Sequence, residues 1–141
     1  MAAPTGVRAF ADASFFSEAL DSPKTLEKQL VELFLEDAAL TPGVLPKRFM
    51  YGTDWKMLVT QAEVEQYLRR FAEVIANVTA ELAAKGLPIP MLGQQFFGAN
   101  AVDYLGLRRG EHSRNRLERF YACAGLEVTP TWMTKVDRLP S

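Results

Sequence analysis

An apolar stripe between residues 60 and 86 constrains the fold of this chain more than any other sequence feature. Thr60 and Glu63 have the spacing of a capping box, and Gly86 followed by Pro88 is typical of a helix end. Between these limits apolar residues recur at helical spacing: Val64, Tyr67, Leu68, Phe71, Val74, Ile75, Val78 and Leu82. The sequence therefore predicts one long helix that buries a single face.

Further helices are predicted on both sides of this one. Ser22 and Pro23 have the composition of a helix start, and the Thr-Pro-Gly sequence at 41–43 ends the pattern. The apolar residues between them again follow helical spacing: Leu26, Leu30, Leu33 and Phe34. Two shorter helices are expected near 94–105 and 114–124, and the tail after them has no clear period.

Two segments have the pattern of strands. Residues 7–16 begin with alternating side chains, which favours a short strand, although a helix is an open alternative there. Residues 48–53 form a compact apolar run that is typical of a strand buried on both faces. Strands alternating with helices predict parallel pairing in an α/β structure. Because two strands leave open edges on each side, we expect part of a larger α/β structure.

Composition excludes several classes of protein. The chain has 141 residues, the length of one domain, and 16 basic against 17 acidic side chains give no excess of positive charge. No nucleic-acid partner is therefore expected. A single cysteine excludes an intrachain disulfide. No secretory signal and no apolar run of about 20 residues is present, so we predict no membrane association and a cytoplasmic location.

Three motifs together resemble a known family. The run Arg-Phe-Met-Tyr-Gly-Thr-Asp-Trp at 48–55 is similar to the last barrel strand of amidohydrolase-related proteins. Residues 97–107, with Asn-Ala followed by a leucine-rich turn, resemble the closing helix of that family. Asp12-Ala-Ser14 is a looser match to the end of the preceding strand. One departure is Lys56, where the family often has proline.

This resemblance implies a metal-dependent hydrolase with a (β/α)8 TIM barrel. Residues 1–141 would be a single C-terminal fragment that supplies the last two strand-helix units and the C-terminal helices. The intact enzyme would hydrolyse or decarboxylate a small carboxylated or cyclic substrate with a divalent metal such as zinc. The family's His-x-His pair and its other ligand histidines are absent, and His112 is the only histidine. The isolated chain is therefore predicted to be inactive and to hold no metal.

The resemblance singles out Asp54 as the residue that would ligate the metal or accept a proton from water at the end of a buried strand. The alternative is that Asp54 caps the turn into the next helix. Trp55 and Lys56 would bind the substrate above the site. Their alternatives, a packed tryptophan and a solvated lysine, stay open.

Other polar residues have simpler interpretations. Asp12 and Ser14 could reach the site but are favoured as turn residues, His112 is expected at the surface, and Cys123 is expected in the core. A basic stretch is interrupted by glutamates and is expected to be a solvated, salt-bridged helix face; it comprises Arg108, Arg109, Arg114, Arg116 and Arg119.

A second hypothesis comes from a different class. The chain could be a non-catalytic α/β interaction module that retains two barrel units. On either hypothesis we expect self-association through exposed strand edges.

Overall fold

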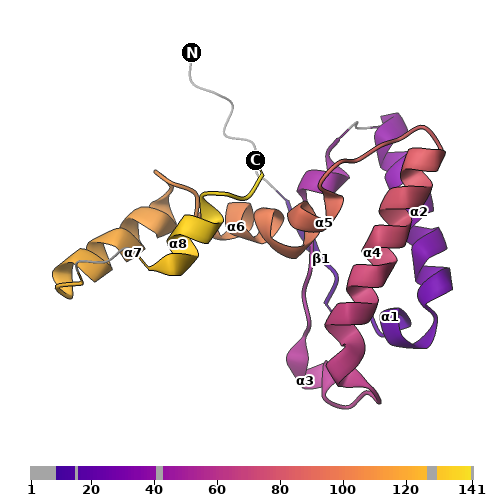
Figure 1. Ribbon diagram of the computed structural model, residues 1–141, viewed down its shortest axis with the longest axis horizontal. Helices are drawn as coiled ribbons and strands as arrows, with labels where there is room; N and C mark the ends of the chain where they lie inside the picture. The colour runs from indigo at the N-terminus through magenta and orange to yellow at the C-terminus, as the bar shows by residue number, and fades with distance from the viewer. Residues whose placement is uncertain (1–8, 15, 41–42, 127–129, 141) are drawn as a thin grey trace.

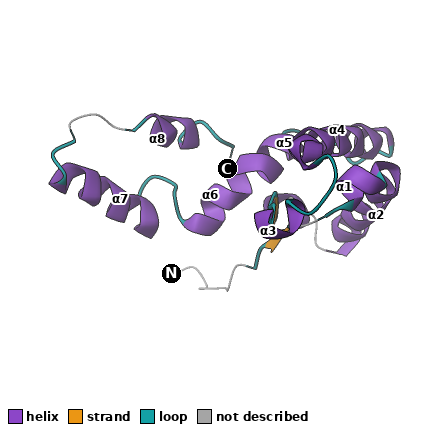
Figure 2. Ribbon diagram, turned by 90° about the horizontal axis from the view of Figure 1, so that it is seen from below, coloured by secondary structure: helices purple, strands orange, loops and turns teal. Residues whose placement is uncertain are grey.

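Helices dominate the computed structural model, which describes residues 9–14, 16–40, 43–126 and 130–140 (Figure 1). The helices of the main body are α1 (Glu18–Asp21), α2 (Pro23–Leu40), η1 (Leu45–Lys47), α3 (Trp55–Leu58), η2 (Val64–Gln66), α4 (Tyr67–Ala84) and α5 (Leu92–Gln94). The chain continues through η3 (Gln95–Ala99), α6 (Asn100–Leu105), α7 (His112–Cys123) and α8 (Thr131–Val136). We call α7 and α8 the arm, because they extend from the main body on the far side of α6 (Figures 1 and 2).

The sheet consists of two short parallel strands. β1 (Ala11–Asp12) pairs with β2 (Phe49–Met50) in a register that places Ala11 opposite Phe49. The ladder continues past the strand end, where the Ala13 amide donates to the Met50 carbonyl at 2.9 Å. The parallel pairing expected from the sequence is present, but each strand is much shorter than the predicted segment.

The predicted fold class, a partial (β/α)8 TIM barrel in an α/β protein, is wrong. The described chain is mostly helical, and its sheet is a small feature among the helices (Figure 2). The reason lies at the second edge of β2. There the Tyr51 amide donates to the Phe96 carbonyl of η3 at 2.8 Å, so a helix occupies the edge that a further strand would take.

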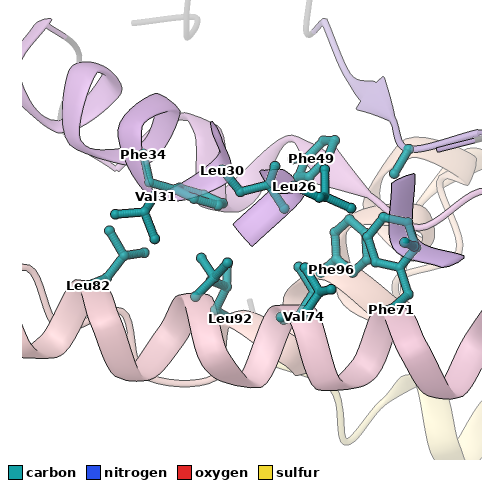
Figure 3. Packing of buried hydrophobic residues seen from close by; sticks show 14 of the residues in the cluster. Leu26, Leu30, Val31, Phe34, Phe49, Phe71, Val74, Leu82, Leu92 and Phe96 are labelled. Atoms are coloured by element: carbon teal, nitrogen blue, oxygen red, sulfur yellow. The ribbon is translucent and has the colours of Figure 1, made fainter. Parts of the chain in front are cut away.

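The core lies between α2 and α4, which pack directly against each other (Figure 3). Leu26, Leu30, Val31 and Phe34 of α2 are buried, whereas Leu33 and Leu68, placed on the apolar faces by their spacing, are exposed. The buried residues of α4 are Tyr67, Phe71, Val74, Ile75, Val78 and Leu82. Aromatic rings close one end of this core. The Phe71 and Phe96 rings stack at 5.2 Å between centroids, and Phe49 lies 5.0 Å from Phe96. Burial of each such side chain contributes about 1.5–3 kcal/mol.

The ends of α4 confirm one prediction and correct another. At its C-terminal end the Leu87 amide donates to the Leu82 carbonyl at 2.9 Å, and Gly86 has φ +85°, which together form a Schellman motif. At the other end the predicted capping box is wrong. The Thr60 hydroxyl donates to the Met57 carbonyl at 2.7 Å, and Glu63 has φ +59°. The helix begins only after this left-handed residue, as η2 followed by α4.

The segment predicted as one helix over 94–105 has three parts. α5 is followed by a π-helical turn, η3, and then by α6. Asn100 fixes the start of α6, because its buried Nδ2 donates to the carbonyls of Pro46 at 2.8 Å and Phe49 at 2.7 Å. This side chain therefore joins α6 to η1 and β2.

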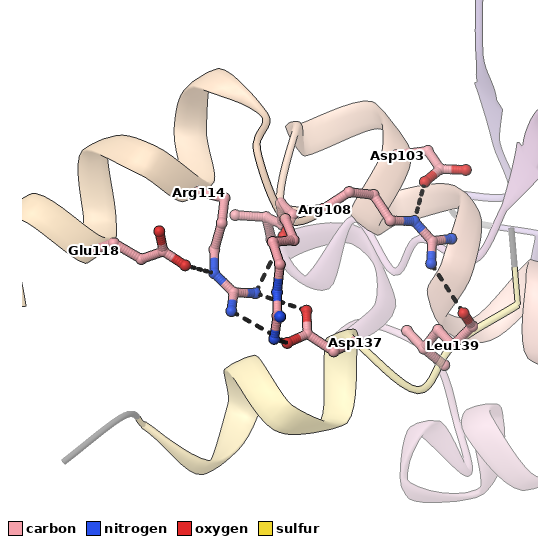
Figure 4. A network of polar contacts seen from close by, with 8 residues as sticks. Asp103, Arg108, Arg114, Glu118, Asp137 and Leu139 are labelled. Carbon is pink, nitrogen blue, oxygen red and sulfur yellow. Dashed lines mark hydrogen bonds and ion pairs between the residues drawn. The ribbon is translucent and has the colours of Figure 1, made fainter.

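Arginine side chains attach the arm (Figure 4). Arg114 is only 2% exposed and contacts the carboxylates of Glu118 at 2.7 Å and Asp137 at 3.2 Å. Arg108 donates to Asp103 at 2.6 Å, to the Leu139 carbonyl at 2.9 Å and to the Pro140 carbonyl. The prediction of a solvated helix face is therefore wrong for Arg114. The sequence also gave no signal for α8, which these contacts hold in place.

Candidate functional site

The C-terminal ends of β1 and β2 meet at Gly52. A Cβ atom at this position would lie 2.4 Å from Ser14 Oγ and 3.3 Å from the Ser14 amide nitrogen, so any other residue would require the Ser14 side chain to move. The sequence-predicted residues Asp12 and Ser14 follow β1, and Asp54 comes two residues after Gly52. The structure therefore brings the three polar positions to the same end of the sheet.

Asp12 and Ser14 form a local turn. The Asp12 carboxylate accepts a hydrogen bond from the Ser14 amide at 3.0 Å, which is the geometry of an Asx turn. Tyr67, at the start of α4, holds the chain just beyond this turn. Its hydroxyl donates to the Ala13 carbonyl and accepts from the Phe16 amide, both at 3.2 Å. These contacts agree with the interpretation of Asp12 and Ser14 as turn residues.

Two tyrosines near the strand ends are poor acids. Burial raises the pKa of Tyr67 to about 12, and burial also raises the pKa of Tyr51. Their rings lie 6.0 Å apart between centroids. Both phenols therefore remain neutral near pH 7, and the Tyr67 hydroxyl positions the backbone through its two hydrogen bonds. Sequence reasoning assigned Tyr67 only to the apolar face of its helix and missed its hydroxyl contacts.

Asp54 has an unusual backbone for a non-glycine residue. Its φ is +38°, in the left-handed region, and such strain typically costs about 1–3 kcal/mol. Its carbonyl accepts from the Met57 amide at 2.8 Å, which starts α3, but its exposed carboxylate has no hydrogen-bond or ion-pair partner among the described residues. The carboxylate therefore does not cap the following helix through any described contact. The Asp54 carboxylate is an exposed hydrogen-bond acceptor without a described donor.

Trp55 and Lys56, the predicted substrate-binding residues, are the first two residues of α3. The tryptophan side chain lies outside the described part of the structure, and the lysine is exposed. A small hollow of about 230 Å³ lies beside this segment, with Tyr51, Thr53 and Leu68 among its lining residues. The structure thus places an apolar surface next to the strand end that carries Asp54.

The residues present do not fit a divalent metal. Stable metal sites need three or four convergent ligands, and the described residues contain no group of three or more histidines, cysteines, aspartates or glutamates that could hold one. His112 is exposed at the start of α7 in the arm, away from the strand ends (Figure 1). Cys123, expected in the core, is also exposed on α7, so that prediction is wrong. Asp54 remains the one sequence-predicted ligand at the strand ends.

Comparison of this chain with protein-family models, with curated proteins and with solved structures gives no match. Among the helices of the described ranges, none is long and apolar enough to cross a lipid bilayer. Any assignment of function therefore depends on the geometry of the strand ends and on the sequence motifs that surround them.

Proposed function

We propose that this chain is one part of a metal-dependent hydrolase of the amidohydrolase-related kind and is inactive alone. The observation that carries this proposal is the arrangement of Asp54. A left-handed backbone holds an exposed carboxylate four residues after the short parallel strand β2. Strain of this kind persists where the surrounding structure imposes it, and it is often found at functional sites. The motif that contains Asp54 is also the one that resembles this family.

The role proposed for Asp54 is that of a proton acceptor. An exposed carboxylate without a partner can take a proton from a water molecule that attacks a small carboxylated or cyclic substrate. Lys56 would neutralise a substrate carboxylate, and Trp55 would contact its apolar part. Because the described residues do not fit a metal, zinc or another divalent ion would need ligands from a second polypeptide.

The test begins with the chain purified from its native cells together with any polypeptide that accompanies it. Hydrolase and decarboxylase activity are then measured for the wild type, Asp54→Asn and the matched control Asp12→Asn. We expect Asp54→Asn to lower turnover about 10²- to 10⁴-fold, because the proton acceptor is lost. Asp12→Asn should stay near wild type, since an asparagine oxygen can accept the same turn hydrogen bond. Near-normal turnover in Asp54→Asn would remove Asp54 from the proposed role.

The second candidate function is that of a non-catalytic interaction module. One specific observation favours it, namely the apolar side chains exposed around α3 and α4. Met57 is 47% exposed, Val59 61% and Leu68 57%. β1 also pairs with β2 alone within the described ranges. Sedimentation at low micromolar concentration tests the self-association expected from these surfaces, and a stable monomer with a sharp melting transition would contradict it.

A further inference from the structure

A second hollow lies at the opposite end of β2 from Asp54. It has a volume of about 390 Å³ and is formed where the end of α2, η1, the segment 87–90 and η3 come together. Its lining includes Phe34, Pro46, Lys47, Leu87, Ile89 and Gln95. Small-molecule sites in proteins typically have volumes of about 300–1,000 Å³ and mostly apolar walls. The size and lining of this hollow suit a ligand of one ring with a short chain.

Gln95 carries two further signs of a binding site. Its Oε1 is buried without a hydrogen-bond partner, and no other side-chain atom of the described residues is in that state. Buried polar atoms are nearly always bonded, so an unpaired one calls for an explanation. Gln95 also begins the π-helical turn η3, a rare conformation that is often found at functional sites. Oε1 is an acceptor, but no hydrogen bond to the described residues fixes the side-chain amide, so it can turn and present its Nε2 donor to a ligand in place of Oε1.

The walls of the hollow are fixed by hydrogen bonds. The two bonds from Asn100 hold the carbonyls of Pro46 and Phe49, on either side of Lys47. The Schellman motif at the end of α4 holds Leu87 on the opposite wall. The Asp37 carboxylate, which also lines the hollow, accepts from the Leu45 amide at 3.0 Å. The hollow is therefore preformed, which lowers the entropic cost of binding.

The positive charge of Lys47 indicates the class of ligand that this hollow would bind. Lys47 is exposed at the hollow and makes no ion pair with any described residue. Phe34, Leu87 and Ile89 supply apolar surface around it. We propose that this hollow binds a small carboxylic acid with an apolar body. The ligand carboxylate pairs with Lys47 and accepts from Gln95 Nε2 after the side-chain amide has turned to bring this donor to the place of Oε1. Repulsion from Asp37 keeps the carboxylate on the Lys47 side.

Titration with phenylbutyrate, followed by the chemical shifts of backbone amides, tests this proposal. We expect saturable shifts at the residues of the hollow, and none with phenylbutylamine or phenylbutanol at the same concentrations. Lys47→Gln should weaken binding about tenfold, as expected when one charge-assisted hydrogen bond is lost. Ile89→Trp should abolish binding by filling the hollow. Lys135→Gln, which removes the same charge from an exposed position in α8, should leave the affinity unchanged.

Three outcomes would overturn the proposal: no saturable shifts with phenylbutyrate, shifts centred elsewhere, or equal binding of the alcohol or the amine. An unchanged affinity in Lys47→Gln would also overturn the proposal. Because Lys47 is exposed, this variant should fold, and a loss of binding in it cannot be attributed to misfolding. Asp54→Asn should bind phenylbutyrate like the wild type, because Asp54 lies beyond the other end of β2. The inference therefore stands or fails independently of the proposed hydrolytic role.

Discussion

Asn100 offers the sharpest test of how this fold is held together. Its side chain is 2% exposed, and its Nδ2 is the donor to two carbonyls, those of Pro46 and Phe49. Asn100→Asp keeps the shape of the side chain but replaces this donor by an acceptor. Both carbonyls then lose their described partner and face a carboxylate or a carboxylic acid. The substitution therefore preserves packing while it removes the donor and introduces a buried carboxyl group.

The expected loss follows from the number of groups left unpaired. Each buried polar group without a partner costs about 1–3 kcal/mol, so two of them predict a loss of about 2–6 kcal/mol in the free energy of unfolding. Domains of this size have about 5–15 kcal/mol in total. Asn100→Asp should therefore lose a large part of the free energy of unfolding. Because the two carbonyls belong to η1 and β2, the preformed hollow beside Lys47 should also be lost.

Asn115 provides the matched control. Its Nδ2 also donates to a backbone carbonyl, that of Gly110 at 3.0 Å, but this contact is exposed. Water can replace it, so Asn115→Asp should cost about 1 kcal/mol or less. Urea denaturation followed by circular dichroism measures both variants. If the free energies of unfolding of Asn100→Asp and Asn115→Asp differ by less than about 0.5 kcal/mol, the two buried hydrogen bonds do not hold the fold together.

Three further predictions concern other parts of the chain. Arg114→Met should lower the free energy of unfolding by about 1–3 kcal/mol, which thermal unfolding of the arm measures. This loss is smaller than the loss expected for a fully buried ion pair, because the carboxylates of Asp137 and Glu118 can reach water. Tyr67 has a pKa raised by burial to about 12, against about 10 for an unfolded chain. The contribution of Tyr67 to the free energy of unfolding is complete below pH 10 and is lost as the pH rises toward 12, so stability should fall between these pH values. Constant stability over this range would contradict the burial of the Tyr67 hydroxyl. The isolated chain should retain no stoichiometric metal after dialysis, and one tightly held zinc or manganese per chain in elemental analysis would refute this.

The helices of the core could be predicted because their signals are local. The apolar spacing of residues 23–40 and 67–84 and the glycine at 86 depend only on neighbours along the chain, and the structure has α2 and α4 there. The start of α4 was misjudged because Thr60 donates to Met57 instead of to a residue after it. Local sequence gives the periodicity of a helix more reliably than its first residue.

The strands and the arm could not be predicted, because distant contacts decide them. The run at 48–53 is apolar enough for a strand inside a larger sheet, yet the carbonyl of Phe96, far along the sequence, binds the Tyr51 amide and occupies the edge where a further strand would pair. The burial of Arg114 depends on Asp137 and Trp132, whose ring lies 5.6 Å from the guanidinium. At the candidate site the sequence identified Asp54 but gave no sign of its left-handed backbone.

The different attachment of the main body and the arm has a consequence for cooperativity. Apolar side chains hold α2 against α4, whereas ion pairs from Arg109 and Arg114 to Asp137 join α7 and the residues before it to the end of α8. Salt weakens the second kind of contact much more than the first. The amides of α8 should therefore exchange with solvent through a sub-global opening that leaves the main body intact. Trp132 lies in α8, so its fluorescence should change at this opening, before the main body unfolds.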